Sequence, residues 1–123
     1  MTAVGSIRYC DTMSGRHSVS VSLFDEPSRL LVVTVVGTLE HGNADGFLRD
    51  ARASVDEYWQ AGLEMVKLDV EAVSYIDSSG IGALVELYKY LTSRSARMSL
   101  VNIRPGVRKV MELLGLEKFL HVE

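Results

Sequence analysis

Apolar residues follow a two-residue period at the beginning of the patterned part of the chain. Over residues 19–23 they alternate with serines, which predicts a half-buried strand. The turn-forming residues 25–28 come next, and residues 30–36 then form a continuous apolar run that ends at Gly37. Because a run that is apolar on both faces is typical of a strand covered on both sides, we expect a central strand here. The short connection predicts that the two strands form a hairpin.

The period becomes helical after Gly37. Asn43 is placed to cap a first helix and Gly62 to end it. The expected buried stripe of this helix consists of Phe47, Leu48, Ala51, Val55 and Tyr58. Residues 65–70 are again strand-like, and a second helix begins near Gly80. Its expected core-facing residues are Ile81, Leu84, Val85, Tyr88 and Leu91.

The C-terminal part of the chain repeats the order of strand and helix. Residues 98–101 predict a further strand, Pro105 suits the first position of a third helix, and Gly115 suits its end. The expected buried face of this helix consists of Val107, Val110, Met111 and Leu114. Residues 119–122 can add a last short strand. The resulting order, β-β-α-β-α-β-α-β, predicts an α/β fold with a mixed sheet of about five strands packed with three to four helices.

Residues 1–18 carry no apolar period, so we expect a flexible N-terminal tail before a single domain over residues 19–123. The chain has 13 basic and 16 acidic residues, and the net charge of −3 argues against a general nucleic-acid binder. The single cysteine, Cys10, excludes an intramolecular disulfide and fits a reducing cytoplasm. No apolar run approaches the roughly 20 residues of a membrane span, and the N-terminus lacks the apolar block of a signal peptide. We therefore expect a cytoplasmic protein without a membrane partner.

The sequence Asp77-Ser78-Ser79-Gly80 lies at the junction between an extended segment and the second helix. Ser78 is placed to cap this helix, and the glycines at positions 80 and 82 leave its first turn open to close approach. A phosphate on Ser78 would be tolerated at the helix N-terminus and would add a charge of about −1.5 to −2. The simpler interpretation is that Ser78 is only a cap and that the glycines only aid packing. The residues alone favour this simpler interpretation.

Residues 73–84 (VSYIDSSGIGAL) resemble the signature of the bacterial anti-sigma factor antagonists. These are stand-alone members of the STAS family (sulfate transporter and anti-sigma factor antagonist). The likeness extends over the whole predicted domain and includes residues 37–41 and 107–116. It implies a STAS-like fold, and it places Ser78 at the position that is phosphorylated in this family.

The resemblance also implies a partner-switching role. The unphosphorylated antagonist would bind an anti-sigma factor that is also a serine kinase, and this binding would free a sigma factor for transcription. The kinase would use ATP to phosphorylate Ser78 and release the antagonist, and a serine phosphatase would restore it. The residues expected to contact the partner are Glu40, His41, Asp77, Ser79, Gly80, Ala83 and Leu87.

Some of these residues fit two roles. Ala83 and Leu87 belong to a second apolar line on the middle helix, which fits either burial or contact with a partner. Asp77 fits either orientation of the Ser78 hydroxyl for a kinase or local capping of the loop. The chain departs from the family pattern in two ways: Glu40 stands where family members often have aspartate, and the usual closing helix is missing after the fifth strand.

Other functions fit the residues less well. An enzyme would use Ser78 or Ser79 as nucleophile and His41 as base, but the chain has no Gly-x-Ser-x-Gly motif and nothing places an oxyanion hole. One cysteine and three scattered histidines lack metal-ligand spacing, so we expect neither catalytic residues nor a metal or other cofactor. The alternative function is a STAS scaffold or a nucleotide-binding module of a stress-signalling complex. The chain has no Walker-type phosphate loop to support nucleotide binding.

Overall fold

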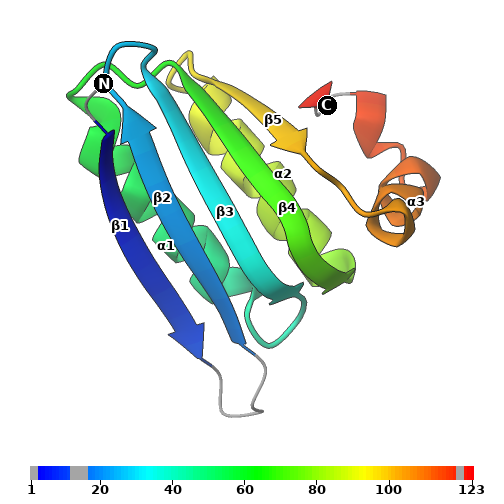
Figure 1. The fold of residues 1–123 in the computed structure, drawn as a ribbon. Coiled ribbons are helices and arrows are strands. Elements are labelled where there is room, and N and C mark those ends of the chain that lie inside the picture. The colour runs from blue at the N-terminus through cyan, green and yellow to red at the C-terminus, as the bar shows by residue number, and fades with distance from the viewer. Residues whose placement is uncertain (1–2, 12–16, 119–120) are drawn as a thin grey trace.

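The fold is a six-stranded mixed sheet with helices, shown by a computed structural model that describes residues 3–11, 17–118 and 121–123 (Figure 1). In chain order the elements are β1 (Ala3–Asp11), β2 (His17–Asp25), β3 (Leu30–Leu39), α1 (Ala44–Trp59), β4 (Met65–Ile76), α2 (Ser78–Thr92), β5 (Arg97–Val101), α3 (Pro105–Leu113), the 3-10 turn η1 (Leu116–Lys118) and β6 (His121–Val122). From β2 onward this order confirms the predicted alternation of strands and helices. Of the predicted last strand, residues 119–120 lie outside the described part of the chain.

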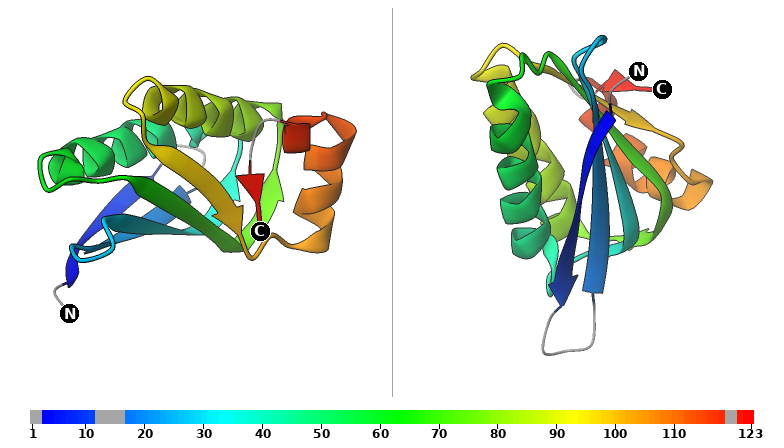
Figure 2. Two further views of the ribbon diagram at one scale, coloured as in Figure 1. Left: turned by 90° about the horizontal axis from the view of Figure 1, so that it is seen from above. Right: turned by 60° about the vertical axis from the view of Figure 1, so that its left-hand side comes forward.

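The strands lie in the sheet in the same order as in the sequence, from β1 to β6. The pairs β1–β2 and β2–β3 are antiparallel, which confirms the predicted hairpin. The pairs β3–β4, β4–β5 and β5–β6 are parallel, so the sheet is mixed as expected. Helices α1 and α2 lie side by side over one face of the sheet, and α3 lies apart from them near the carboxyl end of β4 (Figures 1 and 2). Of the described helices, none combines the length and the apolar character that crossing a bilayer requires.

The structure differs from the predicted tail over residues 1–18. Ala3–Asp11 forms strand β1, which pairs with β2 along its whole length, from Ala3 opposite Asp25 to Asp11 opposite His17. The strand β2 also begins at His17 rather than at Val19. The physical reason is that the exposed backbone groups of β2 offer hydrogen bonds to any extended neighbour, whether or not its side chains have an apolar period. The pattern of side chains therefore gave no sign of this strand.

The prediction that β3 is covered on both faces is wrong. Leu31, Val33 and Val35 are fully buried on the face that carries the helices. On the opposite face, Val36 is 45% exposed, and Leu23 on the neighbouring strand β2 is 51% exposed. Helices α1 and α2 both lie on the other side of the sheet, so alternate residues of this apolar run remain accessible (Figure 2).

The core lies between the sheet and the two helices α1 and α2. Its largest fully buried side chains are those of Phe24, Phe47, Leu31, Leu39, Leu68, Leu84, Leu87, Leu91, Leu100 and Met111. The ring of Phe24 stacks on that of Tyr58 with 5.0 Å between their centroids, which joins β2 to the end of α1. Burial of this apolar surface holds the two helices to the sheet and fixes the orientation of α2 on it.

The predicted helix boundaries agree with the structure. Pro105 is the first residue of α3, where its missing N–H costs no hydrogen bond. Gly62 and Gly115 follow α1 and α3 with φ angles of +91° and +70°. A residue with a side chain adopts such angles only with steric strain. Asn43 occupies the cap position of α1, but its side chain makes no cap hydrogen bond.

Candidate functional site

Two loops meet where the parallel strands β3 and β4 end. The strand register places Thr38 opposite Tyr75 and Leu39 opposite Ile76, so the chain leaves both strands at the same edge of the sheet. The backbone N–H of Asp77 donates to the carbonyl of Leu39 at 3.1 Å. The carboxyl ends of adjacent parallel strands are common positions for binding sites, because the loops that follow them converge. The sequence motif around Asp77 therefore lies beside the segment that follows β3.

The side chain of Asp77 links these two loops. Its Oδ1 accepts a hydrogen bond from the backbone N–H of Gly80 at 3.0 Å, which caps the first turn of α2. Its Oδ2 accepts one from the backbone N–H of His41, also at 3.0 Å. The predicted cap, Ser78, is instead the first residue of the helix. Asp77 thus has the capping role that the sequence left open for it, and it also holds the loop after β3.

The hydrogen bonds around Asp77 favour its ionised form. Burial by itself raises the pKa of Asp77, but the backbone N–H groups of Gly80, His41 and Ser79 together outweigh this effect. With a smaller contribution from the charge of His41, they bring the pKa of the Asp77 carboxyl below its ordinary value. A negative charge is therefore fixed beside Ser78 at neutral pH.

Gly80 is needed where α2 passes the end of β3. A Cβ at this position would lie 2.1 Å from the carbonyl oxygen of Leu39 and 2.9 Å from Cγ1 of Ile76. Such distances are not possible without a shift of the backbone. At Gly82, by contrast, a Cβ would meet no atom within 4 Å. The packing interpretation thus holds for Gly80, and the open surface expected near these glycines is found at Gly82.

A polar network fixes the loop that carries Glu40. The side chain of Asn43 accepts a hydrogen bond from the backbone N–H of Glu40 at 2.9 Å and donates one to the hydroxyl of Thr38 at 3.0 Å. The carbonyl of Glu40 accepts from the backbone N–H groups of Asn43 and Ala44, both at 2.9 Å. Glu40 is 8% exposed and Asn43 is 1% exposed, so these hydrogen bonds are shielded from solvent. Asn43 therefore orders the turn before α1 through this network, although we expected it to cap the helix.

The expected contact residues differ in how far they reach solvent. His41 is exposed, Asp77 and Ser79 are half-buried, and Glu40 and Gly80 are buried. Ser78, the expected phosphorylation site, is exposed. Ser79 and His41 also line a cavity of about 340 Å³ together with Gly42, Ala44 and Asp45. The structure thus brings the loop after β3 and the start of α2 into one surface, with the side chain of Ser78 exposed beside it.

Ala83 and Leu87 must be removed from the set of contact residues. They are 5% and 0% exposed, because both lie on the side of α2 that packs in the core. Between the two interpretations of this apolar line, the structure supports burial. The reason is that α2 packs on the sheet and also against α1 beside it, so its apolar surface is wider than one stripe.

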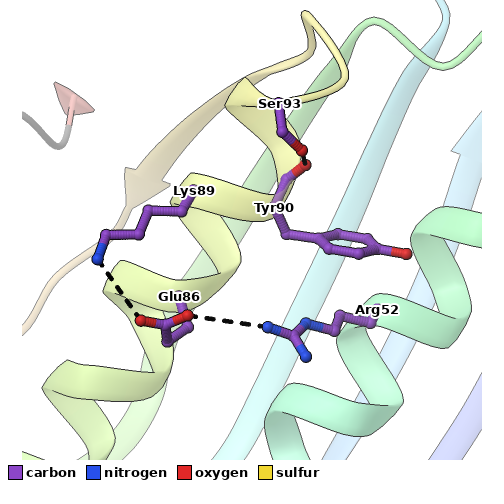
Figure 3. Close-up of polar contacts among 5 residues, drawn as sticks. All are labelled: Arg52, Glu86, Lys89, Tyr90 and Ser93. Atoms are coloured by element: carbon purple, nitrogen blue, oxygen red, sulfur yellow. Dashed lines mark hydrogen bonds and ion pairs between the residues drawn. The ribbon is translucent and has the colours of Figure 1, made fainter.

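A surface cluster joins α2 to α1 at the end away from Ser78 (Figure 3). The guanidinium groups of Arg52 and Arg94 lie over the ring of Tyr90, with their Cζ atoms 5.1 and 3.8 Å from its centroid. Burial of the Tyr90 hydroxyl, together with its hydrogen bond to the carboxylate of Asp56, raises the pKa of Tyr90 above its ordinary value. Glu86 pairs with Arg52 at 3.9 Å. These contacts orient α2 and are distant in sequence from its first turn.

The arrangement presents a hydroxyl at the surface of the protein. The part of His41 that reaches the motif is its backbone N–H, which is held by Asp77. In the described part of the chain, no three or more histidine, cysteine, aspartate or glutamate residues lie together as metal ligands. What the site offers chemically is an exposed serine at the first turn of a helix, next to an ionised carboxylate.

No pattern in the sequence indicated an apolar groove that the structure contains. It lies between the end of β4 and helix α3 and has a volume of about 470 Å³. Its exposed lining residues are Ser74, Tyr75, Arg104, Pro105 and Gly106. The prediction from the sequence used the apolar periodicity within each helix or strand. The groove depends instead on how α3 packs beside the sheet.

Comparisons with known proteins give consistent results. The model of the STAS domain family matches residues 23–123. The anti-sigma F factor antagonist of Paenibacillus polymyxa is 27% identical over 94 residues, which cover 76% of this chain and 77% of that protein. The chloroplastic sulfate transporter 4.1 of Arabidopsis thaliana is 34% identical over 83 residues, which cover 58% of this chain and 12% of the transporter. A crystal structure of an anti-sigma factor antagonist from Mycobacterium paratuberculosis has the same fold, with a TM-score of 0.70, 21% identity and coverage of 85% and 84% of the two chains.

Proposed function

Because this chain belongs to the STAS domain family, we propose that it is an anti-sigma factor antagonist controlled by phosphorylation of Ser78. In its unphosphorylated form it binds an anti-sigma factor with serine kinase activity in the bacterial cytoplasm, and so frees a sigma factor. Phosphorylation by that kinase releases it, and a serine phosphatase restores it. The chain is then a binding module and a kinase substrate, and it carries out no reaction of its own.

The position of Ser78 is the observation that carries this proposal. Its side chain is exposed on the first turn of α2, where a kinase can reach it. The neighbouring turn is held by Asp77 and by the packing of Gly80 against Leu39, so Ser78 is presented on a fixed backbone. The names of the antagonist relatives support the same role.

The local charges support a switch by electrostatic repulsion. A phosphate on Ser78 adds a charge of about −1.5 to −2 next to the carboxylate of Asp77, whose pKa is already lowered. The N–H of Gly80, which a phosphate at the helix end would otherwise attract, is taken by Asp77. The added charge therefore remains at the surface, where a partner must desolvate it. A hundredfold loss of affinity requires only about 2.8 kcal/mol.

The test is to incubate the protein with ATP and the purified anti-sigma kinase of the organism that encodes it. Trypsin cleaves after Lys67 and Lys89, so one peptide contains Ser74, Ser78 and Ser79. Fragmentation of this peptide in a mass spectrometer assigns the phosphate to one serine. We expect phosphate on Ser78, none in the variant Ser78→Ala, and normal incorporation in the matched variant Ser79→Ala.

Binding to the kinase completes the test. We expect Ser78→Asp to bind the anti-sigma factor at least tenfold more weakly than wild type by calorimetry, with the same melting temperature. Phosphate on another residue would refute the site. If Ser78→Asp and the enzymatically phosphorylated protein both bound the anti-sigma factor as tightly as the unphosphorylated wild type, the switch would be refuted.

A further inference from the structure

We infer that the groove between the end of β4 and helix α3 is a second docking site, which binds an apolar side chain next to a carboxylate on a partner protein. The inference extends the proposed function, because the partner that would use the groove is the anti-sigma factor. It assigns to that partner a contact that does not pass through Ser78. It also gives the partner segment a definite chemistry, an apolar residue beside an acidic one.

The groove has the size and lining of a site for one or two side chains. Its volume is about 470 Å³, which lies within the range of small ligand pockets. The described residues that line it are Ser74, Tyr75, Ile76, Arg104, Pro105, Gly106, Val107 and Val110. Most of these are apolar, and Arg104 is the charged one among them. An apolar wall with a single cation favours an apolar group that carries a negative charge nearby.

Tyr75 marks the groove as a contact surface. It is 53% exposed, although it lies in a strand whose inward-facing neighbours Val73 and Ile76 are 0% and 5% exposed. An exposed aromatic ring at the mouth of an apolar groove gains free energy when a partner covers it, and tyrosine is enriched among the residues that dominate interfaces. Tyr75 therefore supplies one wall that a partner can bury.

Arg104 supplies the charge, and its orientation is fixed. Its Nε–H donates to the backbone carbonyl of Glu71 at 2.6 Å, which holds the guanidinium against the middle of β4. A guanidinium has five N–H donors, so one hydrogen bond leaves donors that can reach a carboxylate. Arginine pairs with carboxylates through parallel hydrogen bonds of defined geometry. Like tyrosine, it is common at binding hot spots.

The groove lies close to Ser78 along the chain. Ile76 lines the groove, and Asp77, the cap of α2, and then Ser78 follow it directly. A partner bound over Ser78 therefore lies two residues along the chain from the lining of the groove. Because the groove is lined by β4 and α3, its shape does not depend on the first turn of α2. We expect docking in the groove to persist when Ser78 is charged.

A substitution at Gly106 can fill the groove without strain. A Cβ at this position would meet no atom within 4 Å, and Gly106 lies in the first turn of α3 without a positive φ. The side chain in Gly106→Leu can therefore occupy the groove while the helix forms. The matched control is Gly82→Leu, where a Cβ also meets no atom within 4 Å and which lies in α2, away from the groove lining.

The experiment uses the full chain and a random peptide library displayed on phage. Peptides selected on the wild-type protein are synthesised with a fluorescent label, and their affinities are measured by fluorescence polarisation. We expect selected peptides to share an apolar residue adjacent to aspartate or glutamate. We expect Gly106→Leu to weaken their binding at least tenfold, Arg104→Gln to weaken it at least threefold, and Gly82→Leu and Ser78→Asp to leave it within twofold. Melting temperatures show that each variant is folded.

Two results would overturn the inference. One is a library that yields no shared motif. The other is a set of peptides whose binding is unchanged in both Gly106→Leu and Arg104→Gln. Because this experiment contains no anti-sigma factor, it can succeed when phosphorylation of Ser78 fails, and the reverse also holds. Failure of the groove and failure of the proposed function are therefore distinguishable.

Discussion

The carboxylate of Asp77 accepts the backbone N–H of His41 at 3.0 Å, although the two residues are 36 positions apart in the sequence. The same carboxylate accepts the N–H of Gly80 at 3.0 Å. One side chain thus holds the loop after β3 to the start of α2, and the exposed Ser78 lies between these attachments. This relationship explains why an aspartate precedes the serine, and it leads to the first two predictions.

We expect Asp77→Asn to destabilise the protein by about 1–2 kcal/mol, the usual range for a lost helix cap or buried hydrogen bond. An asparagine oxygen can still accept one hydrogen bond, but its amide nitrogen cannot accept the second. Urea unfolding measures the change. The matched control is Asp45→Asn, an exposed aspartate in the first turn of α1, where we expect less than about 0.5 kcal/mol. Equal effects of the two substitutions would contradict the role given to Asp77.

The contribution of Asp77 should depend on pH. Because its pKa is lower in the folded protein than its ordinary value, the folded state favours the ionised form, and this stabilisation is complete above the ordinary value. It is lost as the pH falls through the lowered pKa of the folded state. The difference in unfolding free energy between wild type and Asp77→Asn should therefore shrink below about pH 4. Urea titrations from pH 7 downward would show this, and a difference that stays constant to pH 3 would count against it.

The two glycines of the motif should respond oppositely to alanine. In Gly80→Ala the new Cβ would lie 2.1 Å from the carbonyl oxygen of Leu39, so the ends of β3 and α2 must separate. We expect a loss of more than about 2 kcal/mol. In Gly82→Ala the Cβ meets nothing, and the helix should gain about 0.5–1 kcal/mol. Thermal unfolding of the two variants is the measurement, and a similar loss in both would show that the close approach at Gly80 is not what matters.

Leu87 should behave as a core residue. It is fully buried, so Leu87→Ala should cost about 2–5 kcal/mol of unfolding free energy. The matched control on the same helix is Glu86→Ala, which removes the ion pairs with Arg52 and Lys89 shown in Figure 3. Both pairs are exposed, and such pairs contribute about 0–1 kcal/mol. If Leu87→Ala were as mild as Glu86→Ala in urea unfolding, the burial of this face of α2 would be in doubt.

The sequence predicted the elements that have a regular apolar period and failed where the period was absent. The stripe from Ile81 to Leu91 corresponds to α2, because helix burial repeats with the helical turn. In α3 the predicted buried face is found at Val107 and Met111, but Leu114 lies past the end of the helix and is 56% exposed. Strand β1 had no such period, since it pairs with β2 through backbone hydrogen bonds that every residue except proline can both donate and accept. The exposure of Val36 was also not predictable, because an apolar run does not say whether a second layer covers it.

The candidate site was predicted in part. The motif from Asp77 to Gly80 was found because its residue types and order resemble a family signature. The partners of these residues were not found. Leu39, whose carbonyl excludes a Cβ at Gly80, and Asn43, whose side chain holds the backbone of Glu40, act through contacts that have no periodicity.

By itself the sequence determined the order of the strands and helices from β2 onward, the family, and the position of Ser78 at the start of α2, because these follow from local pattern and residue identity. The tertiary structure decided which apolar residues are accessible, which side chain caps α2, and that a groove lies beside Tyr75. The physical reason is that burial and hydrogen bonding join residues distant in the chain. His41 and Asp77 meet only because β3 and β4 lie side by side.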